Sequence, residues 1–492
     1  MGDTKGAWRG ALESGNKKIE YVIIASAALL CLLVIKTWWA FFFVVDYSDA
    51  GYYLSCAERI YEGWKPYRDF TVAYPPVGLY YFSFLRALFG GGYVLYKGAL
   101  LVLQIISAFL VYLLSGVLVK SRSLRFWGAL FFLFICLAYE GYFIVLEPFV
   151  NVFSVIAILL LMSNKEKCMF SLIAGISFFL AVMSKQYAIV IIPVLLILLF
   201  KDGEGLPLEF KSGLRRTFFF LTGFLSAFVV LIFYLDVDVW RMVAQLRGTG
   251  YGSNGIAAMA ASLMTIKNVW MPIVVVSGLI MLSRKFRFSL FIVVLLCLLN
   301  FLLLYIRVYP HYYQLILPYA TVLLLYIIQG ALSGNHMFGK TYRYVICIIF
   351  LGISLAYTFI YILDNAAGGK LYERMIHRKY VPRHMATIND YADVARQINR
   401  IVPQGSPVMV INEPIFSYLC NFKPPTHEQG YGWVSSEKDK IDIDMSTIDT
   451  IVWFKGRMIT HEFFLKKIGD SHRMLNSFRH RNGMHVEIWV RK

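Results

Sequence analysis

Residue types suited to acid–base chemistry stand at the ends of apolar segments in this sequence. Glu147 lies about one turn into such a segment, where a carboxylate costs on the order of 2.5–3.5 kcal/mol in a bilayer. A functional role is therefore favoured over a polar turn caused by Pro148. Asp46 and Asp49 follow the first long apolar run, three residues apart, so one helix face can hold both. Asp49 fits a helix N-cap and a general base equally well.

Side chains suited to binding an anion are concentrated in one turn. Arginine and histidine together can bind a phosphate and stabilise it as a leaving group. Lys185 ends another apolar segment and fits either a snorkelling anchor or a phosphate contact. Aromatic residues alone would indicate an interfacial belt, but the number of donors favours an anion site. The residues of this turn are Arg307, His311, Tyr312, Tyr313 and Gln314.

The elements that carry these residues must lie in a membrane. The 492 residues are 58% hydrophobic and 16% charged, whereas soluble domains have about 25% charged residues. A soluble enzyme and a protein with a single anchor are therefore excluded. The net charge of +18 is spread over short loops and the last third of the chain, which argues against nucleic acid as a partner. The seven cysteines lack CxxC spacing, so neither a disulfide framework nor a zinc site is indicated.

The apolar runs predict a polytopic α-helical membrane protein with about 11 transmembrane helices. The loops rich in Lys and Arg alternate with the other loops and share the side of the basic N-terminus. By the positive-inside rule that side is cytoplasmic, which leaves the C-terminal region extracytoplasmic in the cell inner membrane. The predicted helices lie near residues 20–44, 94–119, 125–139, 142–163, 168–184, 187–200, 217–235, 267–283, 288–306, 311–329 and 342–363.

The chain divides into a transmembrane domain, residues 1–364, and a small extracytoplasmic soluble α/β domain, residues 365–492. The transmembrane domain has a long first outer loop, residues 46–93. An amphipathic helix after Asp49 is expected to lie in the membrane interface, and Pro75 and Pro76 open a second helix in this loop. In the C-terminal domain the pattern predicts a helix at 390–401 and strands at 407–411, 447–454 and 485–490.

The chain resembles the GT-C superfamily of membrane glycosyltransferases over roughly residues 20–330. The nearest branch contains the protein O-mannosyltransferase-like and lipid A aminoarabinose transferase-like enzymes of bacteria. The resemblance is carried by an acidic residue after the first helix and by the segments DAGYYLSCAERIYEGWKPYRDF, YPPVGLYYFSFLRALFG, LEPF, SKQ and RVYPHYYQLILP. It implies a transferase that moves a sugar from a polyprenyl-phosphate donor to a hydroxyl acceptor on the extracytoplasmic face.

The resemblance also assigns residues. Tyr53 follows Asp49 at the spacing of the family's Asp-Glu-x-x-Tyr pattern, but Ala50 replaces its Glu. This departure leaves open whether Asp49 or Asp46 is the base, and whether the divalent metal of some relatives is bound. The catalytic candidates are thus Asp49, Glu147 and Asp46, and the donor-phosphate candidates are Lys185, Arg307, His311, Tyr312 and Tyr313. Further pocket candidates are Tyr53, Arg68, Asp69, Tyr74, Lys97, Gln186 and Gln314.

The expected chemistry is an inverting single displacement that requires no cofactor. The expected partners are a polyprenyl-phosphate-linked sugar, an acceptor that is a glycan, lipid or protein, and the bilayer. The strongest alternative is an O-antigen ligase or polymerase. Such an enzyme would have its catalytic loop late in its sequence, whereas the acidic loop of this chain directly follows the first helix. A lipid-linked sugar transporter or flippase would need polar residues near mid-membrane, whereas these helices are mostly apolar at that depth. A non-catalytic receptor formed by the C-terminal domain is a third alternative.

Overall fold

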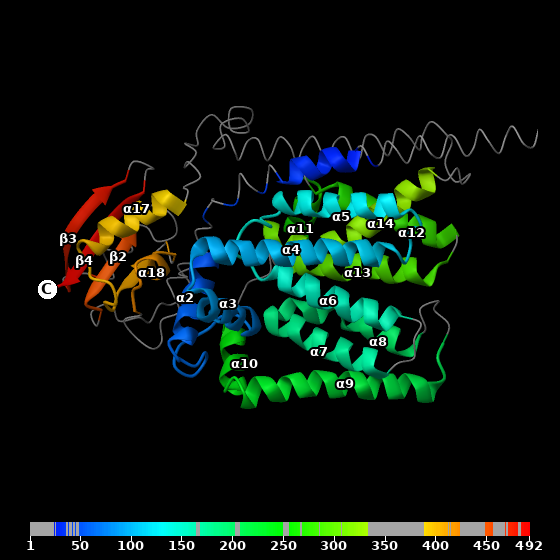
Figure 1. The fold of residues 1–492 in the computed structure, drawn as a ribbon, viewed down its shortest axis with the longest axis horizontal. Helices are drawn as coiled ribbons and strands as arrows, with labels where there is room; N and C mark the ends of the chain where they lie inside the picture. The colour runs from blue at the N-terminus through cyan, green and yellow to red at the C-terminus, as the bar shows by residue number, and fades with distance from the viewer. Residues whose placement is uncertain are drawn as a thin grey trace, which may run out of the picture.

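The structure is a computed structural model, and Figure 1 gives its layout. It describes residues 49–332 apart from 164–167, 202–206, 249–254, 266–267, 285 and 307, and scattered residues between 24 and 45. Near the C-terminus it describes residues 388–423 apart from 412 and 414, and then 448–455, 468, 471–480 and 484–492.

A bundle of apolar helices makes up most of the described chain. Tyr93–Ser115, Phe210–Phe233 and Phe288–Ile306 are each long and apolar enough to cross a membrane. Large apolar side chains lie exposed on their outer faces, such as Phe109 at 57% and Phe218 at 66%, as expected for a surface that faces lipid. The chain is therefore a polytopic helical membrane protein. The helices of the bundle are α4 (Tyr93–Ser115), α5 (Arg122–Leu137), α6 (Glu147–Met162), α7 (Cys168–Ser184), α8 (Ile192–Phe200), α9 (Phe210–Phe233), α12 (Trp270–Arg284), α13 (Phe288–Ile306) and α14 (Leu317–Leu332).

Several predicted helices have different boundaries in the structure. The segment predicted to begin at residue 142 becomes helical only at Glu147, because a turn precedes it and Pro148 occupies the first helical turn. The segments predicted at 187–200 and 311–329 each open with a 3₁₀ turn, η1 (Gln186–Ile191) and η2 (Pro310–Leu315). The predicted helix at 342–363 lies outside the described residues, and the one at 20–44 is described only in part. The count of about 11 crossings therefore stays a prediction.

Glycines allow α7 and α9 to pack closely. A Cβ atom added to Gly175 of α7 would lie 1.9 Å from the carbonyl oxygen of Phe220 on α9. On the opposite helix, a Cβ atom added to Gly223 would lie 2.0 Å from the carbonyl oxygen of Leu172. Small residues at such crossings let membrane helices approach backbone to backbone.

The first outer loop forms α2 (Asp49–Tyr61) and α3 (Val77–Phe89), with Pro76 as the N-cap residue of α3. The location of α2 in the membrane interface stays a prediction, but protein packs against part of its polar face as well as its apolar face. Ser55 and Arg59, on its polar side, are 5% and 4% exposed. The Arg59 guanidinium lies over the ring of Phe70, 5.1 Å from its centroid.

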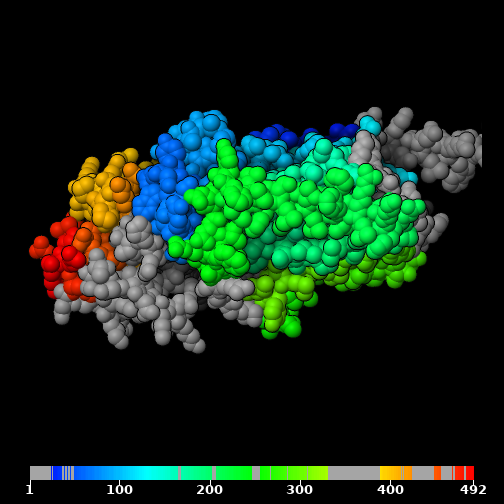
Figure 2. Space-filling model, turned by 90° about the horizontal axis from the view of Figure 1, so that it is seen from below, coloured from blue at the N-terminus to red at the C-terminus, as the bar shows by residue number. Residues whose placement is uncertain are grey.

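Two further short helices follow α9 in the chain: α10 (Val239–Gly248) and α11 (Gly255–Leu263). In Figure 1, α10 lies at the same end of the bundle as α2 and α3. Figure 2, seen from below, shows the blue first loop and the green α10 region against each other on this face.

A small α/β unit lies beyond this end of the bundle (Figure 1). Its sheet has the order β1-β2-β4-β3, with β1 and β2 parallel and the other neighbours antiparallel. Tyr418 of this unit packs edge-on against Tyr96 of α4, with centroids 6.2 Å apart. Strand β3 is an addition to the predicted strands. The elements are α17 (Ile388–Asn399), β1 (Met409–Ile411), α18 (Ile415–Leu419), β2 (Thr450–Phe454), β3 (His472–Arg479) and β4 (His485–Arg491).

Candidate active site

Five ionisable side chains from separate segments form a buried cluster at one end of the bundle. Each segment changes direction there, since a helix begins or ends at or near each of these residues. The members are Asp49 at the start of α2, Glu140 in the turn between α5 and α6, Glu147 at the start of α6, Lys185 between α7 and η1, and His311 in η2.

Lys185 and Glu147 form an ion pair inside the protein. The Lys185 ammonium donates to Oε1 of Glu147, and the two side chains are 1% and 0% exposed. The ammonium also lies over the rings of Tyr312, Tyr187 and Tyr74, with Nζ 4.7, 5.7 and 5.8 Å from their centroids. A buried charge pair of this kind needs such additional contacts to offset its desolvation.

The second carboxylate oxygen of Glu147 is buried and has no hydrogen-bond partner within the described part of the chain. An acceptor left without a donor in a buried site costs about 1–3 kcal/mol, more where the group is charged. A ligand that donates to this oxygen would remove that cost.

His311 lies between two carboxylates. Its Nδ1 is 3.0 Å from Oε2 of Glu140 and its Nε2 is 3.9 Å from Oε1 of Glu147. Burial alone lowers the pKa of His311, but the charge of Glu147 and the hydrogen bond to Glu140 outweigh it, so the pKa is raised overall. The imidazole is therefore held in its charged form to a higher pH than a free histidine.

Asp49 is 8% exposed and stands in the first turn of α2. Burial raises the pKa of its carboxyl group, and the nearby charges of His311 and Lys185 counteract this effect only in part. A carboxylate with a raised pKa accepts a proton more readily at neutral pH. Tyr53, one turn further along α2, is fully buried and packs edge-on against Tyr74 with centroids 5.2 Å apart.

Gln314 holds η2 in place. Its Nε2 donates to the carbonyl oxygen of Tyr139 at 2.8 Å, and its Oε1 accepts from Nε2 of Gln104 at 3.0 Å. Asn151 of α6 donates to the carbonyl oxygen of Gln314 at 3.1 Å. The amide of Gln314 is thus engaged by protein groups, which gives it a role in fixing the turn that carries His311.

Four other residues predicted for the site make separate contacts with protein groups or lie next to a member of the cluster. The Tyr312 hydroxyl donates to Tyr187 at 3.3 Å, and the Tyr313 hydroxyl shares a hydrogen bond with Ser262 of α11. Lys97 is 3% exposed, with Nζ 5.5 Å from the ring centroid of Tyr142. Gln186 begins η1, directly after Lys185.

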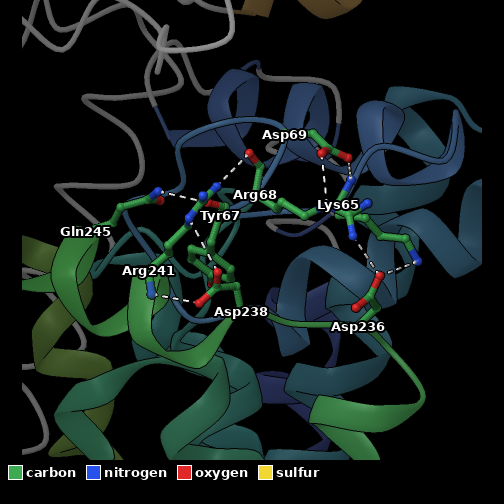
Figure 3. A network of polar contacts seen from close by, with 8 residues as sticks. All are labelled: Lys65, Tyr67, Arg68, Asp69, Asp236, Asp238, Arg241 and Gln245. Atoms are coloured by element: carbon green, nitrogen blue, oxygen red, sulfur yellow. Dashed lines mark hydrogen bonds and ion pairs between the residues drawn. The ribbon is translucent and has the colours of Figure 1, made fainter.

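Arg68 and Asp69 belong to a separate surface network (Figure 3). Arg68 donates to Asp69 at 3.0 Å and to Asp236 at 3.0 Å, where its side chain is 46% exposed. Gln245 of α10 accepts from the Val72 N–H at 2.9 Å and donates to the carbonyl oxygen of Tyr67 at 3.2 Å. The network therefore ties the first outer loop to α10.

Arg307 and Asp46 lie outside the described residues, so their roles stay predictions. Among the residues that the structure does describe, no three His, Cys, Asp or Glu side chains form a group able to hold a metal ion. The expectation that the reaction requires no cofactor stays an untested prediction.

Sequence reasoning missed Glu140, Tyr187, Gln104 and Asn151. Glu140 carries the same signal as Glu147, an acidic residue between two apolar runs. The other three are polar or aromatic residues within or beside apolar segments, where a polar group needs a partner inside the bundle.

No protein-family profile and no curated protein match the sequence. Solved structures do match. ArnT from Cupriavidus metallidurans bound to undecaprenyl phosphate has a TM-score of 0.57 at 12% identity, over 94% of this chain and 98% of that one. The Archaeoglobus fulgidus oligosaccharyltransferase in complex with Zn and sulfate has a TM-score of 0.53 at 12% identity, over 88% and 68% of the two chains. Mycobacterial arabinofuranosyltransferase AftD has a TM-score of 0.50 at 12% identity, over 94% of this chain and 41% of that one.

Proposed function

We propose that this chain, which has the GT-C fold of membrane glycosyltransferases, moves a sugar from a polyprenyl-phosphate donor to a hydroxyl acceptor. The observation that carries the proposal is the buried cluster of three carboxylates and two cations around Glu147. Such a cluster is costly in an apolar bundle, so its default interpretation is functional. The undecaprenyl phosphate bound to the structurally similar ArnT supports a lipid-linked donor.

The donor phosphate is assigned to Lys185, Arg307 and His311. An ammonium has three N–H donors, and Glu147 accepts one of those of Lys185. The remaining donors, with the imidazolium of His311, are available to phosphate oxygens. Charge-assisted bonds of this kind contribute about 1.5–3 kcal/mol each.

The proposed reaction is a single displacement. Asp49 takes the proton from the acceptor hydroxyl as that oxygen forms a bond to the anomeric carbon. The bond from the anomeric carbon to the phosphate oxygen breaks, and its electron pair leaves with the polyprenyl phosphate. Glu147 orients the acceptor, and the cations stabilise the charge that develops on the leaving phosphate. Attack opposite the leaving group inverts the configuration of the sugar.

The site is assigned to the extracytoplasmic face. The first outer loop and the turn that carries His311 both fall on the side opposite the Lys- and Arg-rich loops. The phosphate of a lipid-linked donor sits at the interface with its isoprenoid tail in the bilayer, which suits a site at the end of the helices. A reporter active only in the cytoplasm, fused after Lys492, is expected to be silent.

The test has two measurements. The first is the binding of undecaprenyl phosphate to the purified protein in detergent, and the second is the amount of lipid-linked sugar in cells that have or lack the protein. The wild type should bind the lipid phosphate, and cells without the protein should accumulate a polyprenyl-phosphate sugar. Arg307→Ala should weaken binding about tenfold or more. The matched control is Arg122→Ala, at an exposed position at the start of α5. No binding and an unchanged lipid pool would refute the proposal.

A further inference from the structure

Glu140 has an unusual backbone conformation at the edge of the site. Its φ is 60°, in the left-handed region that glycine adopts without strain and most other residues avoid. The carbonyl oxygen of Glu140 accepts from the Phe143 N–H at 3.0 Å, which closes a turn before α6. A residue other than glycine persists in this region where its surroundings or its side chain require it.

The side chain of Glu140 reaches His311 from the more open side of the cluster. Glu140 is 23% exposed, His311 is 12% exposed and Glu147 is fully buried. The ring of His311 is fixed by aromatic neighbours, stacked on Tyr309 at 5.6 Å and edge-on to Tyr312 at 4.7 Å. In this orientation the ring presents Nδ1 to Glu140 and Nε2 toward Glu147.

The direction of the hydrogen bond follows from the chemistry of the two groups. An ionised carboxylate only accepts hydrogen bonds, so Nδ1 of His311 must carry the proton that it shares with Glu140. Nε2 then faces the interior of the site, 3.9 Å from Glu147 and too far for a direct hydrogen bond. In the charged imidazolium Nε2 also carries a proton, and this proton is available to a bound ligand.

We propose that Glu140 is a positioning residue that fixes the orientation and the charge of His311, so that Nε2–H of the imidazolium points at a phosphate oxygen of the donor. This inference rests on the proposed function. Four ionisable groups act on the ring: Glu140 from the turn after α5, Glu147 from α6, Lys185 from the end of α7 and Asp49 from α2. Lys185 already pairs with Glu147, which leaves Glu140 as the carboxylate hydrogen-bonded to the imidazole.

The experiment follows the titration of His311 directly. The protein is labelled with ¹⁵N and ¹³C in its nine histidines, and the His311 signal is assigned from its loss in His311→Gln. Glu140→Gln keeps the size and an acceptor oxygen but removes the charge, whereas Glu140→Asp keeps the charge. The matched control is Glu62→Gln, which removes an exposed carboxylate just beyond the end of α2.

We expect the pKa of His311 to fall by about one pH unit or more in Glu140→Gln and to stay at the wild-type value in Glu62→Gln. Affinity for undecaprenyl phosphate should decline as the pH rises and His311 loses its charge. In Glu140→Gln this decline should occur at a lower pH than in the wild type. Glu140→Asp should restore part of the shift. An unchanged His311 titration in Glu140→Gln would overturn the inference.

Glu140→Gly separates positioning from a purely structural role. Glycine suits a φ of 60°, so this variant should fold at least as well as the wild type and still show the lowered His311 pKa. If Glu140→Gln fails to fold, Glu140→Gly carries the same test. A wild type that binds no undecaprenyl phosphate would overturn the proposed function and the phosphate contact. The NMR titration would still decide whether Glu140 positions His311.

Discussion

The ammonium of Lys185, just after α7, pairs with the carboxylate of Glu147, at the start of α6, where both side chains are almost completely buried. Neither group can be removed alone without leaving an unpaired charge in an apolar bundle. Breaking a buried pair from one side typically costs about 3–5 kcal/mol, whereas replacing both partners is often close to neutral. The pair is therefore a structural element as well as part of the proposed site.

This reasoning predicts a strongly non-additive double-mutant cycle. Glu147→Gln and Lys185→Met should each lower the thermal unfolding midpoint in detergent, and the double variant should recover most of the loss. Both single variants and the double variant should lack transfer activity, because the restored packing does not restore the charges. Additive losses of stability would contradict the buried pairing.

Asp49→Asn should separate the two roles considered for Asp49. Asparagine keeps the size and much of the helix-capping ability of aspartate, but it is not a base. Turnover should fall by about 10²–10⁴-fold, while binding of undecaprenyl phosphate stays near the wild-type value. Initial rates with a radiolabelled donor measure the first quantity, and lipid binding by native mass spectrometry measures the second. Near-normal turnover, with Glu147→Gln inactive, would move the base to Glu147.

The same variant has a predicted effect on stability that depends on pH. Burial raises the pKa of Asp49 in the folded protein, so folding is most favourable where the group is protonated, below the unfolded pKa. This contribution is lost as the pH rises through the folded pKa. Asp49→Asn should therefore unfold at a higher temperature than the wild type at pH 8, with a smaller difference at pH 5. Thermal scans at both values, with the exposed Glu62→Gln as control, test the sign.

Much of the fold follows from the sequence because long apolar runs have few alternatives in a membrane. The helix predicted at 288–306 is the observed α13, and the second helix of the outer loop begins directly after Pro75 and Pro76 as predicted. The sequence was less informative about what α2 packs against. Amphipathicity identifies a helix with two different faces, but it does not show that Arg59 on the polar face lies buried over the ring of Phe70.

The site was harder to predict because its contacts join residues far apart in the chain. Lys185 and Glu147 are 38 positions apart, and His311 and Glu140 are 171 apart. The topology indicated one membrane face for the predicted residues, but not which cation would meet which carboxylate. The role of Gln314 was also hidden, because a glutamine that binds a ligand and one that binds Gln104 look alike in sequence.

The attachment of α10 should depend on Gln245 more than on the ion pairs of Asp236. Asp236 pairs with Arg68 at 3.0 Å, but it is 56% exposed, and exposed pairs contribute about 0–1 kcal/mol. Gln245 satisfies two backbone groups in a partly buried position. Hydrogen exchange of α10 should therefore speed up more in Gln245→Ala than in Asp236→Asn. Only the Asp236 effect should shrink in high salt, and the opposite ranking would contradict this assignment.

The crossing of α7 and α9 should tolerate no side chain at its two glycines. A methyl group at Gly175 or Gly223 would overlap a carbonyl oxygen of the opposite backbone, which cannot rotate away as a side chain can. The helices would have to separate, at a cost of about 1–3 kcal/mol or more. Gly175→Ala and Gly223→Ala should therefore lower the unfolding midpoint by several degrees. Gly98→Ala is the control, because its nearest neighbour, the ring of Phe42, would be 3.9 Å away, and alanine favours the helix. Equal midpoints for all three variants would show that this close approach of α7 and α9 is absent.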